Sequence, residues 1–189
     1  MRLRIATMLL LAAGLLASCD KDNPLGEYNS SGEFVVNDRE IVSADEFSRY
    51  ALGYGWREAE TYEIKDDGTA MEQPYWEGRV GGGPEFYEFG EGKATRFVYL
   101  DAYPADAHFD YTMQYDETTG RVYFDGREAF TVLNVSSQKI WIVKPGGVRG
   151  GDNKKIYLYI VLQRLSDEQL QKVRETYTTT KEELDNWFK

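Results

Sequence analysis

Apolar and polar side chains alternate along most of the chain between residues 56 and 165. This period of two is typical of β-strands that bury one face. Turn-forming residues such as Asp67 and Gly68 separate the alternating runs. Short strands joined by tight turns predict an antiparallel meander that closes into a barrel or packs as a sandwich. The predicted strands cover residues 56–65, 69–76, 86–89, 96–101, 109–115, 121–125, 129–135, 139–144 and 156–165.

Helix signals flank the alternating region on both sides. Ser43, followed three residues later by Glu46, has the spacing of a capping box and predicts a short helix over residues 44–52. The same spacing begins at Ser166 and again at Thr180, and it predicts two C-terminal helices. The last predicted strand is apolar on both faces, so we expect the helix that follows it to cover the second face.

The N-terminus has the pattern of a secretory signal that ends at a cysteine. Arg2 and Arg4 give it a positive start, and residues 5–17 are uncharged. This run is shorter than the roughly 20 apolar residues that a membrane-spanning helix needs. Residues 16–19, Leu-Ala-Ser-Cys, resemble the bacterial lipobox. The resemblance implies cleavage before Cys19 and acylation of its thiol and of the new amine.

We therefore expect a signal peptide over residues 1–18, a lipid-anchored tether over 19–33 and the folded domain over 34–189. The tether is polar and rich in turn formers, as linkers are. Several acyl chains on one residue would give a stable anchor in the bacterial cell envelope. The charged residues after Cys19 resemble a surface-export signal of Bacteroidetes-type lipoproteins, and the alternative is retention in the inner membrane. We expect the outer membrane or the cell surface.

Composition narrows the classes of function. The formal net charge is −10, which disfavours nucleic acid and anionic lipid surfaces as electrostatic partners. Cys19 is the only cysteine, so the domain has no internal disulfide and no cysteine nucleophile. His108 is the only histidine, which excludes a site built from several histidines. We expect no metal, no cofactor and no enzymatic activity.

Two groups of charged residues leave other chemistry open. Glu58, Glu60 and Glu63 could contribute to a pair of catalytic carboxylates, although the sequence does not show two of them facing each other. A glycine-rich segment over residues 145–155 has basic neighbours that we interpret as a hairpin rim able to attract an anionic ligand group. These basic residues are Lys144, Arg149, Lys154 and Lys155.

The alternating region resembles the lipocalin-like lipoproteins of Bacteroidetes, within the calycin superfamily. The residues that carry the resemblance are a Gly-Tyr-Gly-Trp entry into the first strand at residues 53–56, an Asp-Gly-Thr turn at 67–69, and Arg164 at the end of an apolar last strand. The resemblance implies a mainly β fold, an antiparallel meander closed into a lipocalin-like barrel with a short N-terminal helix and a C-terminal helix. It also implies that Trp56 packs under Arg164 and closes one end of the barrel.

Two functions fit these observations. In the first, a lipid-anchored barrel binds a small apolar or amphipathic ligand, with aromatic side chains at its mouth. These candidate ligand-binding residues are Tyr111, Tyr115, Trp141, Tyr157 and Tyr159. In the second, a barrel with a filled core docks a protein or a glycan of the envelope, and the terminal Trp187 and Phe188 contribute. The membrane is a partner in both cases, through Cys19.

Overall fold

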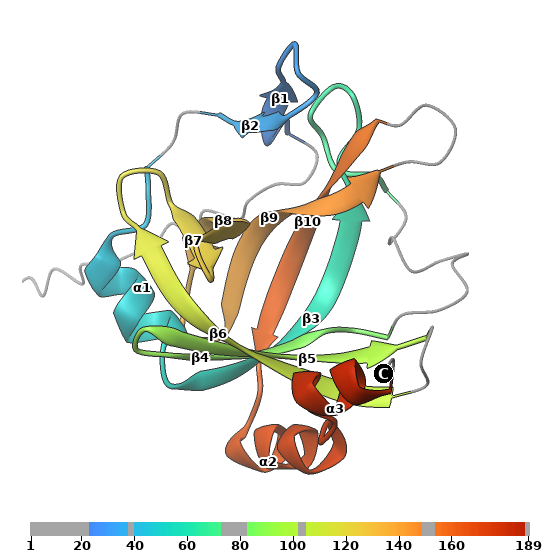
Figure 1. Cartoon of the computed structure of the whole chain (residues 1–189). Helices are drawn as coiled ribbons and strands as arrows, with labels where there is room; N and C mark the ends of the chain where they lie inside the picture. The colour runs from blue at the N-terminus through green and yellow to red at the C-terminus, as the bar shows by residue number, and fades with distance from the viewer. Residues whose placement is uncertain (1–22, 38–39, 73–82, 102–104, 149–153, 188–189) are drawn as a thin grey trace, which may run out of the picture.

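The alternating segment folds into eight antiparallel strands that close into a barrel (Figure 1). The computed structural model describes residues 23–37, 40–72, 83–101, 105–148 and 154–187. The strands follow one another around the barrel in chain order, and the last pairs with the first. They are β3 (Tyr54–Glu63), β4 (Phe86–Gly90), β5 (Lys93–Leu100), β6 (Ala105–Asp116), β7 (Arg121–Phe124), β8 (Arg127–Val135), β9 (Lys139–Val148) and β10 (Lys155–Arg164).

This closure confirms the predicted mainly β barrel and excludes the sandwich. Closure follows because β10 pairs with β9 on one side and with β3 on the other, so the sheet has no free edge. One predicted strand differs. Over residues 69–76 the structure shows an isolated bridge from Ala70 to Ile64, and residues 73–76 lie outside the described part of the chain. The barrel therefore has eight strands instead of nine.

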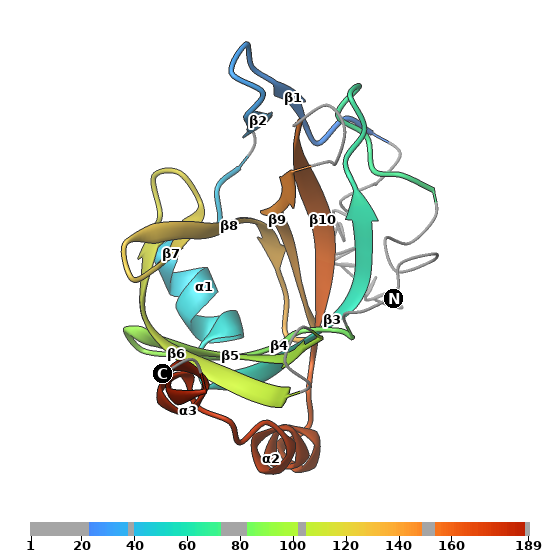
Figure 2. The ribbon, with the colours of Figure 1, turned by 45° about the vertical axis from the view of Figure 1, so that its right-hand side comes forward.

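Helix α1 (Ala44–Ala51) closes one end of the barrel (Figure 2). The predicted capping box is present, with Ser43 and Glu46 bonded to each other's backbone amides. Phe47 of the helix is buried in the interior cluster and stacks on Tyr115 of β6 at 4.3 Å. We call this end, where β3 begins and β10 finishes, the α1 end.

A hairpin that the sequence analysis missed covers part of the outer surface. It consists of β1 (Gly26–Tyr28) and β2 (Phe34–Val36), and its apolar side chains pack on the second face of β10. Leu25 and Phe34 share a buried cluster with Tyr159 and Val161. The second face of the last strand is therefore covered, as expected, but by this hairpin and not by the helix that follows. Leu25 and β1 lie inside the segment 19–33 that was predicted as a tether.

The predicted C-terminal helices are α2 (Asp167–Thr176) and α3 (Lys181–Asn186), and both begin at capping boxes. They pack on a different part of the outer surface (Figure 1). Leu170 of α2 lies against Gly55 at the start of β3, and Arg174 pairs with Glu88 of β4 at 2.6 Å. Leu184 of α3 is buried against the start of β6. None of the described helices is long and apolar enough to cross a membrane, and Cys19 lies outside the described residues.

Substitutions in the β1–β2 hairpin test whether this hairpin contributes to the stability of the folded domain. Phe34 is buried and contacts the rings of Tyr28 and Tyr157 at 5.2 and 5.8 Å, whereas the neighbouring Val35 points to solvent. We expect Phe34→Ala to lower the free energy of unfolding by about 3 kcal/mol. Val35→Ala, the control on the other face of the same strand, should change it by about 0.5 kcal/mol or less. Equal small effects in chemical denaturation would mean that the hairpin adds nothing to the fold.

Candidate functional site

The barrel interior is filled at the α1 end and hollow toward the other end. Inward-facing residues on a strand are two positions apart, so each strand supplies a series of them along the barrel axis. On β3 the series runs from the buried Trp56 to Glu58, and on β9 it runs from Ile142 to Lys144. The first member of each pair packs in the apolar core near α1, and the second lines a cavity.

This cavity has a volume of about 490 Å³. Side chains from all the barrel strands line it, together with Glu85, which directly precedes β4. The lining residues are Glu58, Glu85, Tyr87, Arg96, Tyr111, Phe124, Arg127, Glu128, Ala129, Phe130, Lys144, Pro145, Gly146 and Leu158.

Four charged side chains meet on one side of the cavity. The ammonium of Lys144 donates to Glu58 Oε1 at 2.8 Å, to Glu85 Oε2 at 3.0 Å and to the Tyr87 hydroxyl at 3.1 Å. These contacts engage all three donors that a lysine possesses. Tyr87 in turn donates its hydroxyl proton to Glu85. We call Glu58, Glu85, Arg96 and Lys144, with Tyr87, the ion network.

Arg96 completes the ion network and keeps spare donors. Its Nε and one terminal nitrogen donate to the two oxygens of Glu85, at 2.9 and 2.5 Å. Such bidentate pairing is among the stronger interactions of a carboxylate. A guanidinium has five N–H donors, and the other three have no hydrogen-bond partner among the described residues. Because Arg96 lines the cavity and is partly exposed, these donors are accessible from it.

Burial and neighbouring charges move the two carboxyl groups in opposite directions. Burial by itself would raise the pKa of Glu85, but Lys144 and Arg96 outweigh it and lower that pKa to about 2. Burial raises the pKa of Glu58, which Lys144 offsets only in part. For Lys144, the loss of water is outweighed by Glu58 and Glu85, so its pKa is raised. Glu85 and Lys144 are thus held charged.

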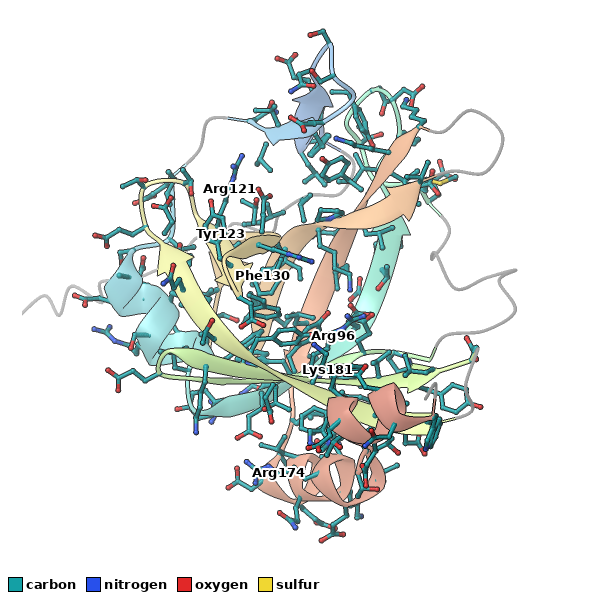
Figure 3. The ribbon with its side chains drawn as sticks, in the orientation of Figure 1. Arg96, Arg121, Tyr123, Phe130, Arg174 and Lys181 are labelled. Atoms are coloured by element: carbon teal, nitrogen blue, oxygen red, sulfur yellow. The ribbon has the colours of Figure 1, made fainter. Side chains whose placement is uncertain are left out.

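Strands β6, β7 and β8 contribute an aromatic part of the cavity wall. Tyr111 stacks on Phe124 with ring centres 5.0 Å apart, and Phe124 meets the edge of Phe130 at 5.8 Å. Figure 3 marks Phe130 on β8 and Arg96 on β5, while Arg174 lies outside the barrel on α2. The cavity therefore combines an apolar wall with a polar, charged one.

The first two residues of β8, Arg127 and Glu128, form a rim of the cavity. Glu128 is paired with Arg121 at 3.3 Å. Arg127 is exposed, and its guanidinium has no ion pair or hydrogen bond among the residues that the structure describes. A ligand that enters with an oxygen-rich group would therefore meet free donors on Arg127 and on Arg96.

Of the five aromatic residues predicted to bind a ligand, Tyr111 on β6 lines this cavity. Tyr115 closes the α1 end instead, where its hydroxyl donates to the Val42 carbonyl at 2.6 Å. Trp141, Tyr157 and Tyr159 do not line this cavity; they lie on the outer face and pack in the cluster under the β1–β2 hairpin.

Trp56 and Arg164 are direct register partners on β3 and β10. The Trp56 indole is fully buried and donates its N–H to the Ala51 carbonyl at 3.0 Å. The ring beneath the Arg164 guanidinium is that of Tyr54, at 3.3 Å. Both residues therefore lie at the α1 end, and the stacked aromatic residue is the tyrosine two positions before the tryptophan.

Sequence reasoning named two members of the ion network without joining them. Glu58 was one of several scattered glutamates, and Lys144 was placed on a basic rim. Glu85, Tyr87 and Arg96 were missed. A signal was present in the sequence. Glu58 on β3 and Lys144 on β9 each stand two positions from a buried apolar residue of the same strand, and so at inward-facing positions.

Among the described residues, no group of acidic, histidine or cysteine side chains could hold a metal ion.

No family model matches the sequence, and no curated protein sequence matches it. Among solved structures, the chain is similar to the siderocalin Ex-FABP, which is described as functioning through dual ligand specificities. The TM-score is 0.34 with 11% sequence identity, and the match covers 65% of this chain and 81% of that chain. A likeness at this level adds nothing to the fold established by the strand order.

The ion network predicts how stability depends on acidity. Between pH 4.5 and about pH 2, the unfolded chain protonates Glu85 and the native chain does not, so stability falls as the pH falls. We expect Glu85→Gln to make this decline shallower in denaturation experiments at several pH values. Glu58 acts in the opposite sense, since its raised pKa favours the native state at low pH. Glu91→Gln, in the exposed β4–β5 turn, controls for the loss of a carboxylate. If the free energy of unfolding falls equally steeply with pH in the two variants, the lowered pKa of Glu85 is not the cause of the decline.

Proposed function

We propose that this chain is a lipid-anchored protein of the bacterial cell envelope whose barrel binds one small amphipathic ligand. The cavity with one aromatic and one charged wall is the observation that carries the proposal. Its volume of about 490 Å³ falls within the range of small-molecule pockets, which are mostly apolar with a few placed polar groups. The apolar part of the ligand would lie against Tyr111, Phe124 and Phe130.

The free donors indicate the chemistry of the ligand's polar end. Lys144 has its three donors engaged within the ion network, whereas Arg96 and Arg127 have donors to spare. Lys144 and Arg96 have their carboxylate partners within the ion network, whereas Arg127 is a cation at the rim without a partner among the described residues. These features favour a group that accepts hydrogen bonds, such as a carboxylate, a phosphate or a carbonyl.

A binding role fits the carboxylates better than a catalytic one. Both oxygens of Glu85 accept from Arg96, and one of them also accepts from Lys144 and Tyr87. Glu58 shares the same ammonium and accepts from the Glu85 backbone amide. A carboxylate with its lone pairs so engaged is poorly placed to transfer a proton to a bound molecule.

The anchor completes the proposal. The Leu-Ala-Ser-Cys motif supports acylation of Cys19, and a multiply acylated cysteine would hold the domain at a membrane. We propose that this membrane is the outer membrane, with the domain related to the lipocalin-like lipoproteins of Bacteroidetes.

A docking module for an envelope protein or glycan is the second candidate. It is favoured by Trp187 of the C-terminal region, which is 57% exposed; Phe188 lies outside the described residues. The hypothesis included a filled barrel, and the cavity does not fit that part of it. We therefore rank it below ligand binding.

A cavity-filling substitution tests the binding proposal. Ala129 lines the cavity, and Ala129→Trp would place an indole in the space that the ligand needs. Residues 20–189 would be exposed to an extract of envelope lipids and small molecules and examined by native mass spectrometry. We expect wild type to carry a discrete adduct that is lost on denaturation, and Ala129→Trp to lose most of it.

The matched control is Gln114→Trp, which adds the same side chain at an exposed position of β6. It should keep the adduct at the wild-type level. A bare mass for wild type across several extracts would count against ligand binding and in favour of the docking module. An adduct that survives Ala129→Trp unchanged would place the ligand elsewhere.

A further inference from the structure

Three segments are tied together at the end of the barrel opposite α1. They are the β1–β2 hairpin, the turn over residues 65–71, and the last residues of β9 together with the first residues of β10. The Leu25 amide donates to the Gly68 carbonyl at 2.9 Å, and Lys155 pairs with Glu33 at 3.2 Å. Lys154 pairs with Asp66. We call this the hairpin end, and Figures 1 and 2 both show it far from α2.

Each of these segments exposes a large apolar side chain. Val35 of β2 is 46% exposed, Met71 at the end of the turn is 42% exposed, and Val148, the last residue of β9, is 60% exposed. Val35 points away from the barrel because Phe34 and Val36, its neighbours on the strand, point toward it. The chain thus leaves apolar groups facing outward at the end where three connected segments meet.

The length of the chain before this end limits what can cover it. Leu25 is fixed to the turn by its hydrogen bond to Gly68, and Asn23 is the first described residue. Cys19 is four residues earlier, which corresponds to at most about 14 Å of extended chain. The α1 end is farther away, since the ten residues of β10 run from the hairpin end to the α1 end and measure about 33 Å along the strand, or about 25 Å along the axis of a barrel with tilted strands.

We propose that the hairpin end rests on the surface of the bilayer, with Val35, Met71 and Val148 at the level of the lipid headgroups. The inference rests on the proposed acylation of Cys19, because a lipid on that residue cannot lie far from the hairpin end. The exposed apolar side chains then face the one surface in reach that can bury them.

This orientation also sets the position of the cavity. Along β9, the buried Ile142 lies toward the α1 end, and the lining residues Lys144 and Gly146 lie toward Val148. The hollow half of the barrel is therefore the half at the hairpin end. With that end on the bilayer, an amphiphile leaving the membrane meets the hollow half first, so the ligand class is a membrane-derived amphiphile.

Fluorescence quenching on reconstituted full-length protein tests the orientation. The acylated thiol of Cys19 cannot react, so a cysteine introduced elsewhere is the one free thiol for a bimane label. Two variants are compared in phosphatidylcholine vesicles that contain nitroxide-headgroup lipid, Val148→Cys at the hairpin end and Lys172→Cys on α2. Both positions are exposed. We expect the label at residue 148 to lose most of its emission and the label at residue 172 to keep nearly all of it.

Equal quenching at the two positions, or stronger quenching at residue 172, would overturn the orientation. The intact mass of the protein, measured before labelling, shows whether Cys19 is acylated. It therefore separates a wrong orientation from a missing lipid anchor. An unacylated Cys19 in the purified mature chain would overturn both proposals. A chain with both Cys19→Ser and Val148→Cys has residue 148 as its one thiol and carries no lipid. With the label at residue 148, it should stay in solution and show no quenching. If it is quenched as strongly as the acylated protein, the lipid does not set the orientation.

Discussion

The ion network around Glu85 is the constraint on which the interior of this barrel depends. A barrel of eight strands is just wide enough for its own side chains to fill it. Here the half next to α1 is filled in that way, by residues such as Trp56 and Phe89. In the other half, the inward-facing positions carry Glu58, Arg96 and Lys144, and each is paired: Lys144 with Glu58 and Glu85, and Arg96 with Glu85. The space beside them is the cavity.

Such an arrangement is costly to a fold. Removing charges from water costs several kcal/mol per ion, and replacing a buried ion pair by apolar residues is often neutral or stabilising. A barrel selected for stability alone would continue the apolar packing of its α1 end. Departures from consistent packing are expected where a protein binds or reacts. The charges, the free donors of Arg96 and the aromatic wall of Tyr111 and Phe124 lie in one cavity, which fits a ligand that is polar at one end.

The alternation of apolar and polar residues was sufficient to predict the barrel strands, and the capping boxes located the helices. The sequence was less informative about which face of a strand points inward. Tyr157 and Tyr159 belong to a strand that is apolar on both faces, and only the unrecognised hairpin decides that their face is the outer one. The hairpin escaped notice because polar turn residues outnumber its few apolar ones, Leu25 and Tyr28 among them. The ion network depends on neighbours that are distant in sequence, so its members could be named singly but not assembled.

The measurement that tests this account most directly removes one ion pair of the network in a charge-balanced way. The double variant Glu85→Leu/Arg96→Met replaces the pair by apolar side chains of similar size and leaves Lys144 with Glu58. The account predicts a protein at least as stable as wild type, to within about 1 kcal/mol in denaturation experiments, that no longer carries the ligand adduct in native mass spectrometry. A folded double variant with the adduct at wild-type occupancy would contradict the claim that the network is retained for binding.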